Sequence, residues 1–209
     1  MKKISTFILT ILIMTNITAQ NIQLPKPQTE GGMPLMEALK KRETKRDFIK
    51  DKEFSLQMLS NLLWAANGIS RPESGKRTAP SAVNWQHVDI FVSLKQGVFL
   101  MNYEKNILEL IKKGDFRSQI GQQDFVGDAS AVLIYVSDRT KMLREGMSDE
   151  TKVFYEATYS GNISQNVGLF ATSENLKNVI IGSIIKENII KILNLKEHQK
   201  PLLGHAVGY

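Results

Sequence analysis

Residues 131–136 read Ala-Val-Leu-Ile-Tyr-Val, an unbroken apolar run within a chain of 209 residues. Such a run is typical of a strand buried on both faces at the centre of a sheet. Upstream, residues 88–94 alternate apolar and polar side chains, and Gln96-Gly97 separates them from a second apolar run at 97–101. This pattern predicts a hairpin. Residues 202–209 are predicted to form the last strand, and 179–185 another, although its isoleucines are also compatible with a helix.

Helical patterns alternate with these strands. Residues 33–42 carry apolar side chains at helical spacing, and Ser55 is a good N-cap for a helix over 56–66 that Asn67-Gly68 ends. Further helices are predicted over 107–112, 151–175 and 187–195, with a polar loop over 70–80. Helices and strands in this order predict an α+β domain over residues 33–209, preceded by an extended leader at 20–32 that contains Pro25, Pro27, Gly31 and Gly32.

The composition excludes several classes of function. The chain has no cysteine, so disulfides, thiolate metal sites and cysteine nucleophiles are excluded. Its three histidines, His87, His198 and His205, show no metal-ligand spacing, and we expect no metal site. The net charge of +6 is too small and too scattered for nucleic-acid binding. A mild positive charge suits an anionic ligand, although solubility alone also explains it.

The first nineteen residues have the pattern of a secretory signal peptide. Lys2 and Lys3 are followed by an apolar stretch over 7–14 and by a cleavage site between Ala19 and Gln20. The apolar stretch is shorter than the roughly 20 residues of a spanning helix. We therefore expect an exported, periplasmic bacterial protein without stable membrane insertion, an uncleaved interfacial anchor being the alternative.

Two segments carry candidate binding residues. Arg42, Thr44 and Arg46 alternate near the end of the first predicted helix. Alternate residues of an extended segment project to one side, and arginine forks bind phosphate through charge-assisted hydrogen bonds. The alternative is a solvated basic helix end whose charges complement the helix dipole. Residues 79–86, Ala-Pro-Ser-Ala-Val-Asn-Trp-Gln, form a turn that presents backbone N–H groups, a hydroxyl and an amide, or else a short helix capped by Ser81.

Together these segments resemble the flavin-holding motifs of FMN-dependent nitroreductases, Arg-x-Ser/Thr-x-Arg/Lys and then Pro-Ser-x-x-Asn-x-Gln. Residues 161–166, Gly-Asn-Ile-Ser-Gln-Asn, resemble a run in the azoline-oxidising, SagB-type branch of that family. The resemblance covers residues 33–209. It implies a nitroreductase-like α+β fold with a central, mostly antiparallel sheet, flanking helices and a long central helix at a homodimer interface.

The resemblance also implies the cofactor-binding residues. These are Arg42, Glu43, Thr44, Arg46, Pro80, Ser81, Ala82, Asn84, Gln165, Asn166, Ile181 and Gly182. Arg42 and Thr44 would lie at the ribityl-phosphate end of FMN and Arg46 near the pyrimidine, where a positive charge stabilises reduced flavin. The backbone at Gly182 would approach the flavin N5 atom. The alternatives are polar interface packing for Gln165 and Asn166, and a glycine within a strand for Gly182.

The implied activity is that of an FMN-dependent oxidoreductase. Hydride would pass through flavin N5 between NADH, NADPH or another donor and a small organic acceptor. The cofactor would carry the chemistry, so no catalytic side chain is assigned. Export places the protein away from cytoplasmic nicotinamide coenzymes, which favours another donor or the oxidative direction. The alternative is an exported, non-catalytic flavin-binding or interaction domain of the same fold.

Overall fold

Seven strands form the main sheet in the computed structural model, which describes residues 20–209; the predicted signal peptide, 1–19, lies outside the described residues. The order across the sheet is β1-β6-β5-β4-β7-β9-β8, and neighbouring strands are antiparallel. The strands are β1 (Ile22–Gln23), β4 (Val88–Leu94), β5 (Gly97–Asn102), β6 (Ile107–Lys113), β7 (Ala131–Asp138), β8 (Lys177–Ile181) and β9 (Gln199–Gly208). β7 is the predicted apolar strand, and it lies buried between β4 and β9.

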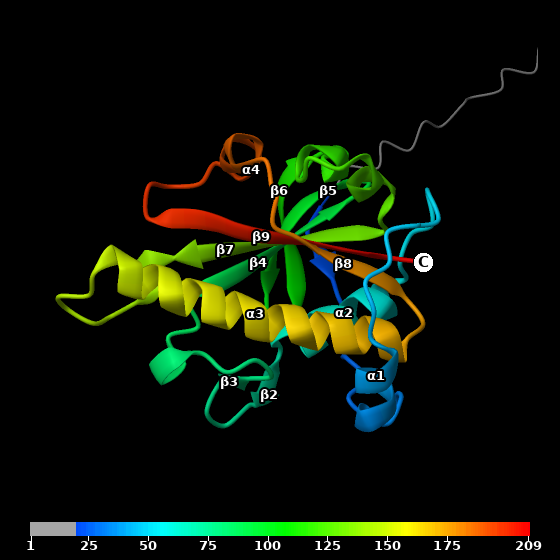
Figure 1. The fold of residues 1–209 in the computed structure, drawn as a ribbon, viewed down its shortest axis with the longest axis horizontal. Coiled ribbons are helices and arrows are strands. Elements are labelled where there is room, and N and C mark those ends of the chain that lie inside the picture. The colour runs from blue at the N-terminus through cyan, green and yellow to red at the C-terminus, as the bar shows by residue number, and fades with distance from the viewer. Residues whose placement is uncertain (1–19) are drawn as a thin grey trace, which may run out of the picture.

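Helices cover both faces of this sheet (Figure 1). The helices are α1 (Leu35–Lys41), α2 (Leu56–Asn67), α3 (Asp149–Ser173) and α4 (Lys186–Leu193). On one face, Leu62 of α2 and Ile163 of α3 pack in a core with Leu133 of β7. On the other face, Ile189 of α4 packs in a second core with Ile134 of β7. The predicted α+β, nitroreductase-like architecture is therefore confirmed, because the central sheet is antiparallel and α3 is the long helix that crosses it.

The predicted serine cap of α2 is confirmed, and the long helix α3 has a serine cap that was not predicted. The hydroxyl of Ser55 accepts a hydrogen bond of 3.1 Å from the Met58 amide at the start of α2. Ser148 caps α3 in the same way, accepting from the Thr151 amide at 3.2 Å. α2 ends at Asn67, but Gly68 is extended rather than left-handed. Glycine is required there because a Cβ atom would collide with Trp64. Within residues 20–209, the structure holds no helix with the length and apolar character that a membrane crossing requires.

One predicted helix is wrong. Residues 107–112 belong to β6, which pairs with β5 and with β1. Asn106 adopts a positive φ of 53° at the turn, and the amide of Lys105 donates to the side chain of Asn102. This turn reverses the chain into a hairpin, so long-range pairing decides the conformation of a segment with mixed local preference.

Two segments that were predicted as irregular contain short strands. The polar loop over 70–80 includes a small hairpin of β2 (Ile69–Arg71) and β3 (Lys76–Arg77). The leader at 20–32 contributes β1 at the edge of the main sheet, and its Leu24 is buried in the core. Both segments therefore belong to the folded unit.

Candidate functional site

A groove of about 480 Å³ lies between α3 and the end of the sheet formed by β8 and β9. We call it the α3–β9 groove. Its volume falls within the range of about 300–1,000 Å³ that small-molecule sites occupy. The lining residues are Arg139, Val153, Glu156, Ala157, Ser160, Gly161, Ser164, Gln165, Ile180, Lys186, Lys200, Pro201, Leu202 and Leu203.

A bulge in β9 shapes the floor of this groove. Tyr135 of β7 pairs with Leu203, whereas the next residue, Val136, pairs with Pro201, so Leu202 is an extra residue in β9. Bulges bend a strand locally and recur beside binding sites. Here Pro201, Leu202 and Leu203 all line the groove, which gives it an apolar floor together with Ile180.

The wall of the groove is a stripe of small residues on α3. Ala157, Gly161 and Ser164 line the groove at intervals of four and three residues, which places them on one face of the helix. Gly168 continues the stripe by a further four residues. A methyl group at Gly168 would lie 3.8 Å from Cδ of Arg42 and 3.6 Å from Oδ1 of Asn178. Arg42 therefore lies against the same face of α3 that walls the groove.

The segment after α1 runs along the free edge of β8. The Lys45 amide donates to the Asn178 carbonyl at 3.0 Å, and the Ile49 amide donates to the Tyr209 carbonyl at 2.7 Å. Both contacts are long-range, so they fix a segment that has no helix or strand of its own. They hold the candidate Arg-x-Thr-x-Arg residues beside the sheet.

In this segment, acidic side chains are paired with lysines, whereas the two candidate arginines have no partner among the residues that the structure describes. Glu43 forms an ion pair of 2.8 Å with Lys45, and Asp47 forms one of 2.8 Å with Lys177. Among residues 20–209, no hydrogen bond or ion pair engages the guanidinium groups of Arg42 and Arg46. The two candidate arginines thus remain exposed cations, whereas the candidate Glu43 is already paired with a lysine.

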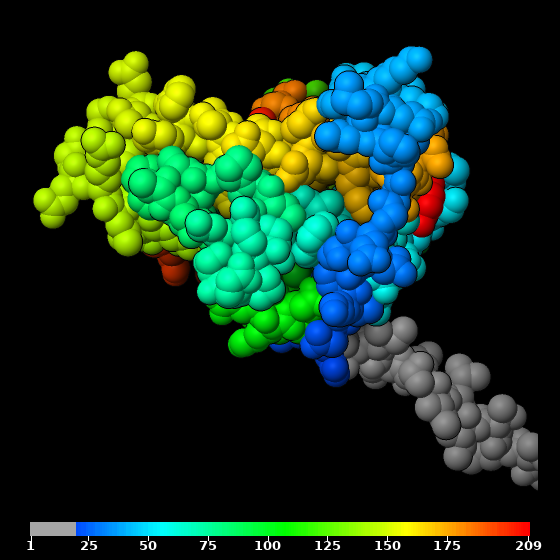
Figure 2. Space-filling model, turned by 90° about the horizontal axis from the view of Figure 1, so that it is seen from below, coloured from blue at the N-terminus to red at the C-terminus, as the bar shows by residue number. Residues whose placement is uncertain are grey.

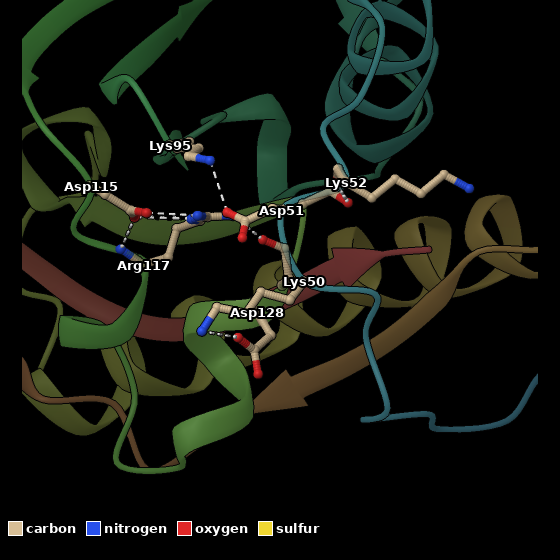
Figure 3. A network of polar contacts seen from close by, with 9 residues as sticks. Lys50, Asp51, Lys52, Lys95, Asp115, Arg117 and Asp128 are labelled. Atoms are coloured by element: carbon tan, nitrogen blue, oxygen red, sulfur yellow. Dashed lines mark hydrogen bonds and ion pairs between the residues drawn. The ribbon is translucent and has the colours of Figure 1, made fainter.

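A polar network anchors the end of the same segment (Figure 3). Lys95, in the turn between β4 and β5, pairs with Asp51 at 2.8 Å, and the hydroxyl of Ser130 donates to the Lys52 carbonyl at 2.5 Å. Beside them, the guanidinium of Arg117 is buried and bound by both oxygens of Asp115, at 2.9 and 2.6 Å. This network fixes residues 50–52 against the sheet.

Residues 80–84 lie against a different face of α3. The Pro80 carbonyl accepts a hydrogen bond of 2.9 Å from the Asn162 side chain. Asn162 and Gly168 are six residues apart, which is roughly 9 Å along a helix and about 240° around it. Figure 2 shows the surface of α3 between the β2–β3 region on one side and the segment around α1 on the other. One chain therefore does not bring the two predicted motifs together.

Within the loop, local contacts hold the predicted residues. The Ser81 hydroxyl accepts from the Gln86 amide at 3.1 Å, and the Asn84 side chain accepts from the Gln86 side chain at 3.0 Å. Ala82–Asn84 form a short 3-10 turn, but Ser81 makes no capping hydrogen bond to it. Asn84 also lines a polar cavity of about 300 Å³ that contains Arg77, Asp89 and Lys141.

Of the remaining predicted residues on α3 and at the end of β8, only Gln165 lines the groove. Gln165 is exposed in the groove, whereas Asn166 does not line it. Ile181 is buried in the core on the opposite face of the sheet and does not line the groove. Gly182 follows the end of β8, is exposed, and has open space where a side chain would stand.

Under the groove lies a buried chain of polar groups that sequence reasoning missed. The His205 ring lies between the Tyr135 hydroxyl, 3.0 Å from Nδ1, and the Asn178 side-chain oxygen, 3.1 Å from Nε2. Burial lowers the pKa of His205 to about 3, so the ring is neutral. An amide oxygen only accepts hydrogen bonds, so Nε2 carries the proton and Nδ1 accepts from Tyr135.

Charged groups gather at the end of the groove farthest from Arg42. Glu156 is buried and bound by Arg139 through two hydrogen bonds of 2.8 and 3.1 Å. Burial is the largest single effect on the pKa of Glu156 and raises it, but the hydrogen bonds and the charge of Arg139, together with smaller contributions from neighbouring groups, lower the pKa overall. Among residues 20–209, Lys186 and Lys200 form no ion pair, and both line the groove.

The missed residues were partly visible in the sequence. The small residues Ala157, Gly161, Ser164 and Gly168 recur at helical spacing, which marks a face where another group approaches the helix closely. Asn178, Lys186 and Lys200 carry no such signal, because only the folding of β8, α4 and β9 brings them to one place. A larger cavity of about 600 Å³, between the leader and α2, contains none of the predicted site residues.

Comparison with known proteins agrees with this architecture. A model of the nitroreductase family matches residues 39–209. A proposed nitroreductase of Methanocaldococcus jannaschii is 29% identical over 197 residues, which cover 90% of this chain and 95% of that protein. The crystal structure of a proposed nitroreductase from Ralstonia eutropha JMP134 superposes with a TM-score of 0.84 at 33% identity, covering 91% of this chain and 89% of that one. The NADPH:FMN oxidoreductase of Vibrio harveyi, solved with NAD+, has a TM-score of 0.59 at 20% identity and covers 84% of this chain and 68% of its own.

Proposed function

Because this chain belongs to the nitroreductase family, we propose that it is an FMN-dependent oxidoreductase that moves two electrons between a donor and a small organic acceptor. The observation that carries the proposal is the position of Arg42. It lies at the end of the stripe on α3 that walls an apolar-floored groove, and its guanidinium is exposed and without a partner among residues 20–209. A cation at one end of a flat apolar surface suits a planar ring that carries a phosphate.

The residues present fit this cofactor. Arg42, with Thr44 beside it, would hold the phosphate end, and Arg46 would add positive charge near the ring. Ile180, Leu202 and Leu203 offer an apolar surface for the ring, and the buried hydroxyl of Ser164 has no partner among the described residues. Bound FMN supplies two-electron hydride chemistry, while the protein supplies position and electrostatics.

The overall reaction requires one hydride equivalent from the donor and one proton from water for each acceptor reduced. NADH and NADPH are the donors we propose to test first, with an acceptor small enough to enter the groove. The neutral chain of Tyr135, His205 and Asn178 does not donate that proton in our proposal. It holds the Asn178 side chain beside Arg42 and excludes water beneath the groove.

We further propose that the protein is a homodimer whose second copy completes the site. Arg42 and the Pro80 loop lie on different faces of α3 in one chain. A two-fold axis across α3 would bring the Pro80 loop of one copy to the groove of the other. Export is likewise proposed, because residues 1–19 read as a signal peptide; N-terminal sequencing of the secreted protein would then begin at Gln20.

A titration of the purified protein with FMN tests the function. Arg42→Ala should weaken FMN binding by roughly tenfold to a hundredfold, since hydrogen bonds to charged groups contribute about 1.5–3 kcal/mol. Arg144→Ala is the matched control, because Arg144 is an exposed arginine that precedes α3, at the opposite end of that helix from Gly168 and Arg42, and it does not line the groove. Anaerobic addition of NADH or NADPH should then bleach the flavin absorbance.

Three results would contradict parts of the proposal. Absence of FMN binding by the wild-type protein at micromolar concentration would contradict the proposal that FMN is the cofactor. Equal weakening by Arg42→Ala and Arg144→Ala would contradict the assignment of the FMN site to Arg42. Flavin that binds but is not reduced by any donor tested would favour the non-catalytic binding domain.

A further inference from the structure

A polar cavity of about 300 Å³ lies beside the Pro80 loop (residues 80–86) and shares no lining residue with the α3–β9 groove. Its walls come from the end of α2, β3, the Pro80 loop, the start of β4, the end of β5 and the turn that contains Lys141. We call it the Arg77 cavity. Its volume is at the lower end of the range for small-molecule sites, so it suits a compound smaller than FMN.

Asn67 offers an unused hydrogen-bond donor to this cavity. The residue is only 2% exposed and lines the cavity at the end of α2. Its side-chain oxygen accepts a hydrogen bond of 2.8 Å from the Tyr159 hydroxyl. Among residues 20–209, its side-chain nitrogen donates to no protein atom. A buried amide nitrogen is rarely left without an acceptor, so the acceptor must come from what fills the cavity.

Tyr103 offers a second unused donor. Its hydroxyl is buried and has no partner among the described residues. The guanidinium of Arg77 lies over the Tyr103 ring, 4.6 Å from its centroid, and both residues line the cavity. Burial raises the pKa of this hydroxyl well above its usual range, so the hydroxyl keeps its proton and can donate it at neutral pH.

Arg77 is a cation that no carboxylate balances. Its Nε donates to the Gln86 side chain at 2.7 Å and its Nη1 to the Asn67 carbonyl at 3.4 Å. In the part of the chain that the structure describes, its Nη2 has no acceptor. The one carboxylate of the cavity, Asp89, is bound by Lys141 at 2.6 Å. The unmatched groups are therefore donors around a positive charge, which favours an anion with oxygen acceptors.

We propose that the Arg77 cavity binds a small organic carboxylate. Its two oxygens would accept from the Arg77 guanidinium, the Tyr103 hydroxyl and the Asn67 amide, so one planar group would satisfy all three donors. Ile90 and Met101 also line the cavity and offer apolar contact to a short hydrocarbon chain, which an inorganic anion lacks. Because none of the three donor residues belongs to the proposed FMN site, this inference stands apart from the proposed function.

Nuclear magnetic resonance locates such binding, because Trp85 lines the Arg77 cavity whereas Trp64, the other tryptophan of the chain, does not. The indole N–H signals of the purified protein are followed during a titration with acetate at constant ionic strength, first without FMN and then with it. Trp85→Phe assigns the two signals. The Trp85 signal should shift to saturation with a Kd of about 1 mM, a reasonable value for so small a ligand, and the Trp64 signal should not move.

Two matched compounds test the chemistry of the ligand. Acetamide has the shape of acetate without its charge, and inorganic phosphate has charge without a hydrocarbon part. Each should bind at least about tenfold more weakly than acetate, because the first leaves Arg77 unbalanced and the second leaves the apolar wall uncovered.

Tyr103→Phe removes only the unpartnered hydroxyl, so the variant should fold, and it should raise the Kd for acetate roughly tenfold. Arg77→Lys keeps the charge but loses the planar fork, and it should also weaken binding. Tyr209→Phe is the control, because it removes the same atom from a tyrosine that does not line the cavity.

Three outcomes would overturn the proposal. The first is a Trp85 signal that does not shift to saturation with acetate. The second is acetamide or phosphate that binds as tightly as acetate. The third is an equal Kd for acetate in the Tyr103→Phe and Tyr209→Phe variants. Failure of the proposed function does not affect this test, because the first titration uses the protein without FMN.

Discussion

His205 shows how a single buried residue links the sheet to the groove. Its ring accepts from Tyr135 of β7 and donates to Asn178 of β8, so it joins the strands on both sides of β9. The ring is fully buried, and no acidic side chain contacts it in the part of the chain that the structure describes. The folded protein therefore holds this histidine in its neutral form.

Acid should destabilise the protein through His205. Its folded pKa of about 3 lies below the ordinary histidine value of 6.5, so between these values the unfolded chain binds a proton that the folded chain does not. Stability is fully present above pH 6.5 and should fall by about 2 kcal/mol between pH 7 and pH 5. Urea unfolding at both pH values measures the change.

The matched variant is His205→Gln, which keeps a hydrogen-bonding amide and cannot titrate. Its stability should change by less between pH 7 and pH 5 than that of the wild type, because only the acid dependence of buried His87, whose pKa burial also lowers, remains among the buried histidines. The Glu156–Arg139 pair does not disturb the comparison, because the pKa of Glu156 is lowered and the pair is lost only at more acid pH. An equal pH dependence in both proteins would contradict the assignment to His205.

Among the elements, the loop that carries the Pro-Ser motif holds unusual backbone conformations. Val83, Asn84 and Gln86 have φ values of 41°, 57° and 49°. Asparagine tolerates this left-handed region, but a β-branched residue such as Val83 is strained there. Strain of this kind concentrates where the surrounding structure or a ligand fixes the backbone. The short 3-10 turn thus presents the exposed Val83 at some cost in stability.

Replacing Val83 by asparagine should relieve this strain. The expected gain is about 1 kcal/mol, or roughly 2–4 °C in Tm for a chain of this size. Leu143→Asn is the control, because it also removes an exposed apolar side chain from a loop but does so at a residue without positive φ. A similar rise in Tm for both variants, measured by calorimetry, would show that surface polarity and not backbone strain is responsible.

At the scale of the whole molecule, α3 separates the two predicted cofactor motifs. On the side of the sheet that α3 covers, large apolar side chains remain exposed, including Met36 on α1 and Phe154 on α3. An exposed apolar surface beside an incomplete site is what a symmetric dimer would cover. The dimer and the two-copy site are therefore one proposal.

Phe154→Glu should dissociate the dimer. Phe154 is 64% exposed in a single chain, and burying a new carboxylate without a partner at an interface weakens association. Light scattering at micromolar concentration should give a dimer for the wild type and a monomer for the variant. Ile190→Glu, on α4 at the opposite face of the sheet, should remain dimeric (Figure 1). A wild-type monomer, or a dimeric Phe154→Glu, would contradict the interface.

Local chemistry determined much of this fold. The apolar run of β7, the serine cap of α2 and the hairpin at Gln96-Gly97 were predicted correctly because each depends on neighbouring residues alone. The Arg-x-Thr-x-Arg and Pro-Ser segments were recognised for the same reason, since a motif is a local spacing. Their roles in binding FMN stay predictions.

Tertiary structure decided the rest. Residues 107–112 became a strand because β5 and β1 offered pairing partners distant in sequence. The groove exists because a bulge in β9, the small-residue stripe of α3 and the start of α4 meet at one place, where Asn178, Lys186 and Lys200 gather from three separate elements. Local propensity largely determines which elements form. Long-range pairing and packing determine which side chains meet, and a binding site depends on those meetings.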